Sequence, residues 1–292
     1  QNILNFKLDY PHHKTYKLEQ NYRSTSTIVD AANSIIKHNK KQIEKIVWTK
    51  NKTGEKIIVT KTGSDNDEGR LVANTIFDIQ MQNQVHHKDF AILYRTNAQS
   101  RALEESLRKR NIPYKIYGGL SFYQRKEIKD LLAYYRLSIN PHDEEAFKRI
   151  INYPSRGIGT TTIQKLNILA STHNKSIWEI ITLLDDIETK INQGTKKKLK
   201  EFELMINNFI INTKQKDAYS IAEEIAKKTG LFNDLYNDKS PEGVSRFENI
   251  QELLNGIKDF STTAEKNFDK LADFMQDVAL LTNQDKETKD EF

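Results

Sequence analysis

A tyrosine and an arginine stand side by side near the start of the chain, in the run L-E-Q-N-Y-R-S at residues 18–24. The guanidinium of Arg23 is a permanent planar charge that can stabilise negative charge on a phosphoryl group. The ring of Tyr22 can stack on a flat base. A simpler explanation is that the ring packs against the next helix, the guanidinium pairs with a surface carboxylate, and Ser24 or Thr25 caps that helix. The pair alone leaves both explanations open.

A second candidate group follows in the run A-I-L-Y-R-T-N-A-Q-S-R at residues 91–101. Residues 91–93 are typical of a buried strand, and Arg95 and Asn97 come just after it, where open α/β sheets present ligand-binding groups. A third run, Y-G-G-L-S-F-Y-Q-R-K-E-I-K-D at residues 117–130, contributes Lys126. These cations and this amide suit contacts with nucleic-acid phosphates or bases. Asn97 is also a good helix N-cap, so a structural role is the alternative.

The run Y-P-S-R-G-I-G-T-T-T at residues 153–162 lies between two helical patterns. Two glycines flanking an apolar residue let the backbone approach a ligand closely, and the next helix begins with unpaired amide groups. A nucleic-acid phosphate fits such an amide cluster. A short G-I-G is also common as a plain turn between helices. The candidate contacts here are Arg156, Gly157, Gly159, Thr160 and Thr161.

Composition limits the classes of function without choosing one. Of the 292 residues, 45 are Lys or Arg and 40 are Asp or Glu, and the net charge of +5 permits a polyanionic partner without requiring it. The absence of cysteine excludes disulfides, thiolate metal sites and cysteine nucleophiles. The chain has no apolar run of the roughly 18 residues that a membrane span needs, so we expect no membrane contact. The histidine pairs at residues 12–13 and 86–87 lack partners at ligand spacing, and we expect no metal site.

The elements that must position these residues change in kind near residue 122. Short apolar runs predict strands at residues 56–60, 90–93 and 114–117, and spacings of three and four predict helices at 25–38, 68–82 and 98–110. Beyond this point the strand pattern disappears and only helical periodicity remains. It predicts helices at residues 126–139, 144–152, 161–172, 177–184, 196–212, 218–236, 244–260 and 268–281. The fold class expected is therefore an α/β part followed by an all-α part.

The three runs at residues 18–24, 91–101 and 117–130, in this order, resemble the second motor domain of UvrD/PcrA/Rep-type superfamily 1 DNA helicases. The resemblance implies that residues 1–121 form the first part of a RecA-like domain of the P-loop-NTPase type. Residues 122–281 would form its mostly helical insertion, with a helix-hairpin-helix-like motif that contacts duplex DNA. Residues 282–292 would be a charged, disordered tail.

The resemblance also implies a role for each candidate residue. Tyr22 would lie against adenine, and Arg23 would be an arginine finger that reaches the γ-phosphate. Arg95 and Asn97, with Lys126, would contact single-stranded DNA. The contacts with the duplex would come from Arg156, Gly157, Gly159, Thr160 and Thr161.

The activity implied is that of an ATP-dependent DNA helicase or translocase of the bacterial cytoplasm, which unwinds duplex DNA in replication or repair. Its cofactors would be ATP and Mg²⁺, and its partners single-stranded and forked or duplex DNA. The chain contains no G-x-x-x-x-G-K-[ST] run, the loop that binds the phosphates. We therefore expect the first motor domain of the same polypeptide to supply it, and this chain alone to bind no cofactor tightly and to be inactive.

Two alternatives remain open from the residues. The chain could be a stand-alone DNA-binding or protein-interaction module with a helicase-like fold, or a piece of a helicase-nuclease. A phosphate-binding loop encoded upstream of Gln1 would favour the motor, and a nuclease domain encoded downstream would favour the helicase-nuclease.

Overall fold

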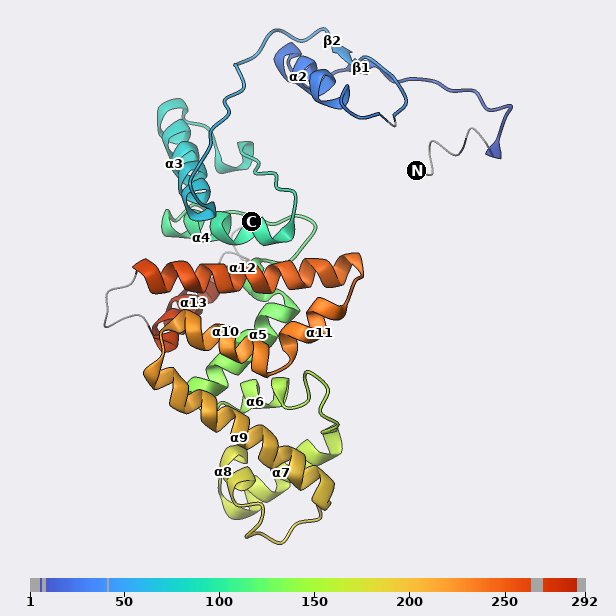
Figure 1. The fold of residues 1–292 in the computed structure, drawn as a ribbon. Coiled ribbons are helices and arrows are strands. Elements are labelled where there is room, and N and C mark those ends of the chain that lie inside the picture. Colours follow the sequence, from blue (N-terminus) through green and yellow to red (C-terminus); the bar gives the residue numbers. More distant parts are fainter. Residues whose placement is uncertain (1–5, 7–8, 41, 264–269, 288–292) are drawn as a thin grey trace. The chain divides into compact units, whose positions relative to one another are not determined.

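The computed structural model describes residues 6, 9–40, 42–263 and 270–287, and it is mostly helical with one small parallel sheet (Figure 1). The chain divides into two compact units, residues 1–62 and residues 63–292. Each unit is described by itself.

The first unit holds the only sheet among the described residues. Its elements are β1 (Gln20–Asn21), α2 (Ser26–Ile36) and β2 (Trp48–Thr49). The two strands run parallel, with Gln20 opposite Trp48. The side-chain amide of Asn33, on α2, donates to the carbonyl of Val47 at 2.7 Å and accepts from the amide of the same residue at 3.2 Å. The crossover helix is thereby tied to the segment that enters β2.

The second unit is built from helices. Those before residue 122 are α3 (Asp65–Asn83), η1 (His87–Asp89), η2 (Asn97–Gln99) and α4 (Ser100–Lys109). Those after it are η3 (Phe122–Gln124), α5 (Lys126–Ile139), α6 (Glu144–Ile150), α7 (Thr160–His173), α8 (Ile177–Thr182), α9 (Gln193–Gln215), α10 (Ala218–Lys228), α11 (Leu231–Asn237), α12 (Pro241–Thr263) and α13 (Leu271–Glu287).

Two hydrophobic cores lie in this second unit, and they divide near residue 122. The smaller core joins α3 and α4 and consists of Ala73, Ile76, Leu107 and Ile112. The larger core begins at Phe122 and continues to Val278, with α5 at its centre. Tyr134 and Tyr135 on α5 are completely buried, and burial raises the pKa of Tyr134 to about 12. Both hydroxyls are hydrogen-bonded to main-chain carbonyls, as buried polar groups must be.

The three strands predicted at residues 56–60, 90–93 and 114–117 are wrong as secondary structure. All three segments lack helix and strand assignments, and no ladder of hydrogen bonds among the described residues joins them to a neighbour. Ile58, Val59 and Leu93 are each more than 85% exposed. A strand exists only with a partner strand, and an apolar run without one stays solvated. The sequence pattern predicts the tendency to form a strand, but not the second segment with which that strand would pair.

The helical predictions are mostly confirmed. The helix α5 begins and ends at the predicted residues 126 and 139, and α6 to α9 differ from prediction by a few residues at their ends. The single helix predicted at residues 218–236 is instead two, α10 and α11, because the backbone turns at Gly230, whose φ is 84°. The helix α13 extends to Glu287, into the predicted tail, and residues 288–292 lie outside the described residues.

The described part of the chain contains no helix that is long and apolar enough to cross a membrane. It also contains no group of three or more His, Cys, Asp or Glu residues that could hold a metal ion.

Candidate functional site

The turn that carries Tyr22 and Arg23 is organised by two asparagines. The side chain of Asn21 accepts hydrogen bonds from the amides of Arg23 at 2.9 Å and Ser24 at 2.7 Å. The side chain of Asn51 donates to the carbonyls of Tyr22 and Ser24. These bonds fix the backbone after β1 and leave both candidate side chains outside the turn.

Both candidate side chains are accessible. The ring of Tyr22 is 79% exposed, and its hydroxyl donates to Gln20 at 2.9 Å. The side chain of Arg23 is exposed, and within the described residues no ion pair or hydrogen bond of its guanidinium is recorded. The predicted helix cap is absent, because neither Ser24 nor Thr25 caps α2 with its side chain. Both side chains are thus free to contact a ligand.

Arg95 and Asn97 lie on a second exposed turn, just before α4. The side-chain oxygen of Gln99 accepts hydrogen bonds from the amides of Arg95 at 2.8 Å and Thr96 at 3.0 Å, which closes the turn. Both candidate side chains are exposed. The cap prediction for Asn97 is wrong, because it is the first residue of η2 and Thr96 stands at the N-cap.

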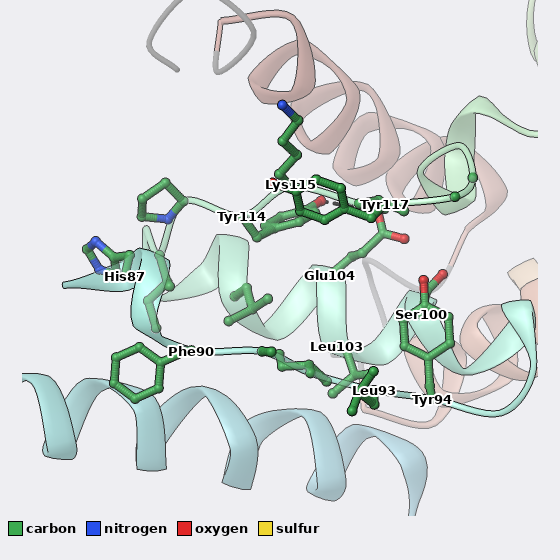
Figure 2. A pocket seen from close by; sticks show the side chains of 18 of the residues that line it. His87, Phe90, Leu93, Tyr94, Ser100, Leu103, Glu104, Tyr114, Lys115 and Tyr117 are labelled. Carbon is green, nitrogen blue, oxygen red and sulfur yellow. Dashed lines mark hydrogen bonds between the residues drawn. The ribbon is translucent and has the colours of Figure 1, made fainter. Parts of the chain in front are cut away.

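A cleft of about 630 Å³ opens beside this turn (Figure 2). Phe90 and Tyr94 come from one extended segment, Tyr114 and Tyr117 from another, and Leu103 of α4 lies between them. Two of the three segments predicted to be strands therefore face one another across a gap. The cleft is mainly apolar, as expected for the space between unpaired strand-like segments.

A buried carboxylate lies at the base of this cleft. Glu104 accepts hydrogen bonds from the amide of Phe122 at 3.0 Å, the hydroxyl of Tyr114 at 3.1 Å and the guanidinium of Arg108 at 3.2 Å. Burial raises the pKa of Glu104, although these donors oppose the shift. The carboxylate joins α4 to Tyr114 on one side of the cleft and to Phe122 of η3, and its partners account for it structurally.

The connection between α6 and α7 carries the third candidate group. The side-chain oxygen of Asn152 accepts hydrogen bonds from the amides of Arg156 and Ile158, each at 3.0 Å. Ile158 is completely buried and anchors the connection in the larger core. Gly157 has a φ of 67°, a conformation that residues with a Cβ atom rarely adopt. Gly157 and Gly159 therefore flank the anchored residue Ile158, which holds this part of the connection close to the helices.

This arrangement presents main-chain donors at the start of α7. Gly159 stands at the N-cap and makes no side-chain cap, while Thr160 and Thr161 are exposed. The first intrahelical bonds recorded are those from Thr162 and Ile163 to the carbonyl of Gly159. The amides of Thr160 and Thr161 therefore lie before the helix's own hydrogen-bond ladder.

Arg156 is directed into the protein. Its guanidinium donates to the carbonyls of Ile150 at 3.0 Å, Pro154 at 3.2 Å and Thr229 at 3.2 Å, and to the hydroxyl of Tyr134 at 2.6 Å. It also lies over the rings of Tyr134 and Phe202. This geometry gives Arg156 a structural role in holding the connection, and it separates Arg156 from the other residues predicted there.

Two lysines flank the same connection. Lys126, predicted from the sequence, is exposed at the start of α5 with its ammonium 5.6 Å from the centre of the Tyr153 ring. Lys198, on α9, was not predicted. Its Nζ lies 2.6 Å from where a Cβ on Gly157 would stand, and no salt bridge of Lys198 is recorded in the described chain. Only a long-range contact brings it here, because 41 positions separate the two residues and no local motif marks Lys198.

Comparison with known proteins gives close relatives along almost the whole chain. An "ATP-dependent DNA helicase PcrA" of Leuconostoc citreum is 37% identical over 288 residues, which are 97% of this chain and 38% of the relative. Proteins of the same name from Staphylococcus epidermidis and Staphylococcus aureus are each 40% identical, over 98% of this chain and 39% of the relative. The chain spans about two fifths of the length of these curated relatives.

Residues 16–291 match the family described as "UvrD-like helicase C-terminal domain", and the chain belongs to that family.

Proposed function

We propose that this chain is part of an ATP-dependent DNA helicase that translocates on one DNA strand and separates the duplex ahead of it. The observation that carries this proposal is the 40% identity to helicases named PcrA over 98% of the chain. The exposed turns at residues 22–23 and 95–97 and the amides at the start of α7 support it, because each offers groups suited to a nucleotide or to DNA.

Tyr22 and Arg23 form one side of the ATP site in this proposal. The exposed ring stacks on the adenine, and the guanidinium stabilises the negative charge that develops on the γ-phosphoryl group as water attacks it. Both roles require free side chains on a fixed backbone, which the turn provides. ATP bound with Mg²⁺ supplies the free energy for movement.

The remaining parts of the ATP site would come from another domain of the same polypeptide. The sequence contains no phosphate-binding loop, and the described residues contain no cluster suited to a metal ion. We assign no magnesium ligand to this chain. Arg23 alone cannot catalyse hydrolysis, because phosphate binding and water positioning need further groups.

The DNA contacts divide between two parts of the chain. Arg95 and Asn97, with Lys126, contact the backbone or bases of a single strand without reading its sequence. The connection between α6 and α7 acts as a helix-hairpin-helix-like motif, in which the amides of Thr160 and Thr161 bind a duplex phosphate beside Gly157 and Gly159.

The division of the chain into domains is also a proposal. We infer that a partial RecA-like domain occupies residues 1–121 and its helical insertion residues 122–281. The separation of the two cores near residue 122 supports this boundary. We also propose a bacterial cytoplasmic location and a role in replication or repair; the support is that the relatives are bacterial proteins named as DNA helicases.

Strand separation by the full-length gene product tests the function. With ATP and Mg²⁺, we expect it to release the labelled strand of a forked duplex, whereas the 292-residue chain releases none because it lacks a phosphate-binding loop. A full-length product that binds the fork but separates no strand over a range of fork designs and of both tail polarities would contradict the proposal.

Replacing Lys198 tests the duplex contact. We expect Lys198→Glu to weaken binding of a short duplex by the 292-residue chain several-fold, and to lower the slope of log affinity against log salt by about one. Fluorescence anisotropy over a salt series measures both quantities.

Lys197→Glu is the matched control, because it makes the same charge change one residue away, on a side chain that pairs with Glu201 at 4.0 Å. We expect it to have the smaller effect. Equal effects of the two variants would show a general loss of charge rather than a contact beside Gly157.

A further inference from the structure

A polar stripe runs along the long helix α12 and faces the exposed turn at residues 95–99. Asn249, Glu252, Gly256 and Asp259 are three, four and three residues apart, so they share one face of the helix. The turn η2 packs on α12, whereas Ile250, Leu253 and Ile257 of α12 are buried in the larger core. Figure 1 shows α12 lying between α4 and the helices α10 and α11.

The middle of this stripe binds Arg101 of α4. Its buried guanidinium donates to Glu252 at 2.7 Å and to Glu105 at 3.1 Å. A Cβ on Gly256 would stand 2.9 Å from the nearest guanidinium nitrogen, so a larger residue here would require this group to shift. Further along, the side chain of Asn66 on α3 donates to Asp259 at 2.7 Å. The helix α4 is therefore attached to α12 through buried polar groups, and α3 through partly buried ones.

The other end of the stripe binds Arg125, and this contact reaches the turn itself. The guanidinium of Arg125 donates to the carbonyl of Asn97 at 2.7 Å, to the side-chain oxygen of Asn249 at 2.9 Å and to the hydroxyl of Ser100 at 2.8 Å. The side-chain nitrogen of Asn249 donates in turn to the carboxylate of Glu127 at 2.7 Å. All of these groups except the Asn97 carbonyl belong to buried residues.

We propose that Arg125 is a positioning residue that fixes the turn at residues 95–99 to α12 through Asn249. It thereby sets where the side chains of Arg95 and Asn97 stand. The proposal rests on the single-strand role proposed for that turn, and it adds that α12, in the helical part, determines the geometry of the contact.

The geometry explains why an arginine serves here. Two of the three acceptors lie on the stretch where η2 runs into α4 and the third lies on α12, and a planar guanidinium with five N–H donors can reach all of them at once. The main-chain carbonyl of Asn97 accepts from the buried guanidinium of Arg125, while the side chain of Asn97 is exposed to solvent. On the same turn, the side-chain oxygen of Gln99 accepts from the amides of Arg95 and Thr96. A displacement of α12 would therefore carry the turn with it.

Two variants and two readouts test the proposal in the 292-residue chain. Arg125→Lys keeps the charge but cannot reach three acceptors, and Asn249→Ala removes the amide without changing the charge. Hydrogen exchange measures how well the main-chain amides of Arg95 and Thr96 are protected, and fluorescence anisotropy measures the affinity for oligothymidylate at low salt. For both variants we expect exchange at these two amides to rise on the order of tenfold, and the affinity to fall several-fold.

The matched control is Asn66→Ala, which breaks the bond to Asp259 and the 3.4 Å bond from Arg101, both away from Asn249. It should lower the free energy of unfolding without changing exchange at Arg95 and Thr96. A second check combines Arg125→Lys with Asn97→Ala. If Arg125 acts through the turn, the effects on affinity are less than additive, because the contact that it positions is already lost.

The possible results test the positioning role of Arg125 separately from the DNA role of the turn. Unchanged exchange at Arg95 and Thr96 in folded Arg125→Lys and Asn249→Ala would overturn the positioning role. Raised exchange in these two variants would support the attachment of the turn to α12. If Arg95→Ala and Asn97→Ala then leave the affinity for oligothymidylate unchanged, the DNA role proposed for the turn is refuted.

Discussion

Replacing Arg23 by alanine in the full-length gene product is expected to lower the rate of DNA-stimulated ATP hydrolysis by about a thousandfold or more, the range known for arginine fingers. The guanidinium is exposed on a turn fixed by Asn21 and Asn51, and no protein partner for it is recorded in the described residues. Its loss should therefore act on the transition state and leave the fold intact. Steady-state phosphate release at saturating single-stranded DNA measures the effect.

Two comparisons make this result specific. Arg70→Ala removes another exposed arginine, whose ion-pair partner in the described residues is Asp67 on α3, and should leave the rate unchanged. The affinity of the Arg23 variant for DNA should also be unchanged, because Arg23 is assigned to the nucleotide. A wild-type rate in the Arg23 variant would exclude it as the finger.

Replacing Arg156 is expected to have the largest effect on stability. Its guanidinium donates to three carbonyls and to the hydroxyl of Tyr134, so Arg156→Ala removes four hydrogen bonds, including those to the buried residues Thr229 and Tyr134. Hydrogen bonds to a charged group are worth more than neutral ones, and we expect a loss of about 3 kcal/mol in the free energy of unfolding. Urea denaturation of the 292-residue chain measures this loss.

Arg246→Ala provides the comparison, because Arg246 makes a surface pair with Glu242 one helical turn away. Its loss should cost at most about 1 kcal/mol. Arg156→Lys, studied where it remains folded, should bind duplex DNA as well as the wild type. A drop in duplex affinity without a loss of stability would return Arg156 to the DNA interface.

The helices could be predicted because their evidence is local. Apolar residues recur at spacings of three and four on α5, and this local period predicts the element from Lys126 to Ile139. The structure buries the helix on nearly all sides, at the centre of the larger core. The strands could not be fixed in the same way. The apolar runs at residues 56–60 and 90–93 are real, but a strand forms only where a second segment supplies hydrogen bonds, and no local pattern reports that.

The candidate site shows the same limit. The positions of Arg95, Asn97 and the glycines near α7 follow from short motifs, and the structure places them on exposed turns or a helix start. The direction of a side chain does not follow from a motif. Arg156 was predicted as a DNA contact, yet its guanidinium lies against Tyr134, and Lys198 lies beside Gly157 only because α9 packs there.

The most direct test of the account is phosphate release from ATP by the purified 292-residue chain, measured beside the full-length gene product at equal concentration with single-stranded DNA. We expect release by the full-length product and none by the chain, because Tyr22 and Arg23 are proposed to form one side of a site whose phosphate-binding loop is absent from this sequence. Robust DNA-stimulated release by the chain alone, free of contaminating ATPases, would contradict it.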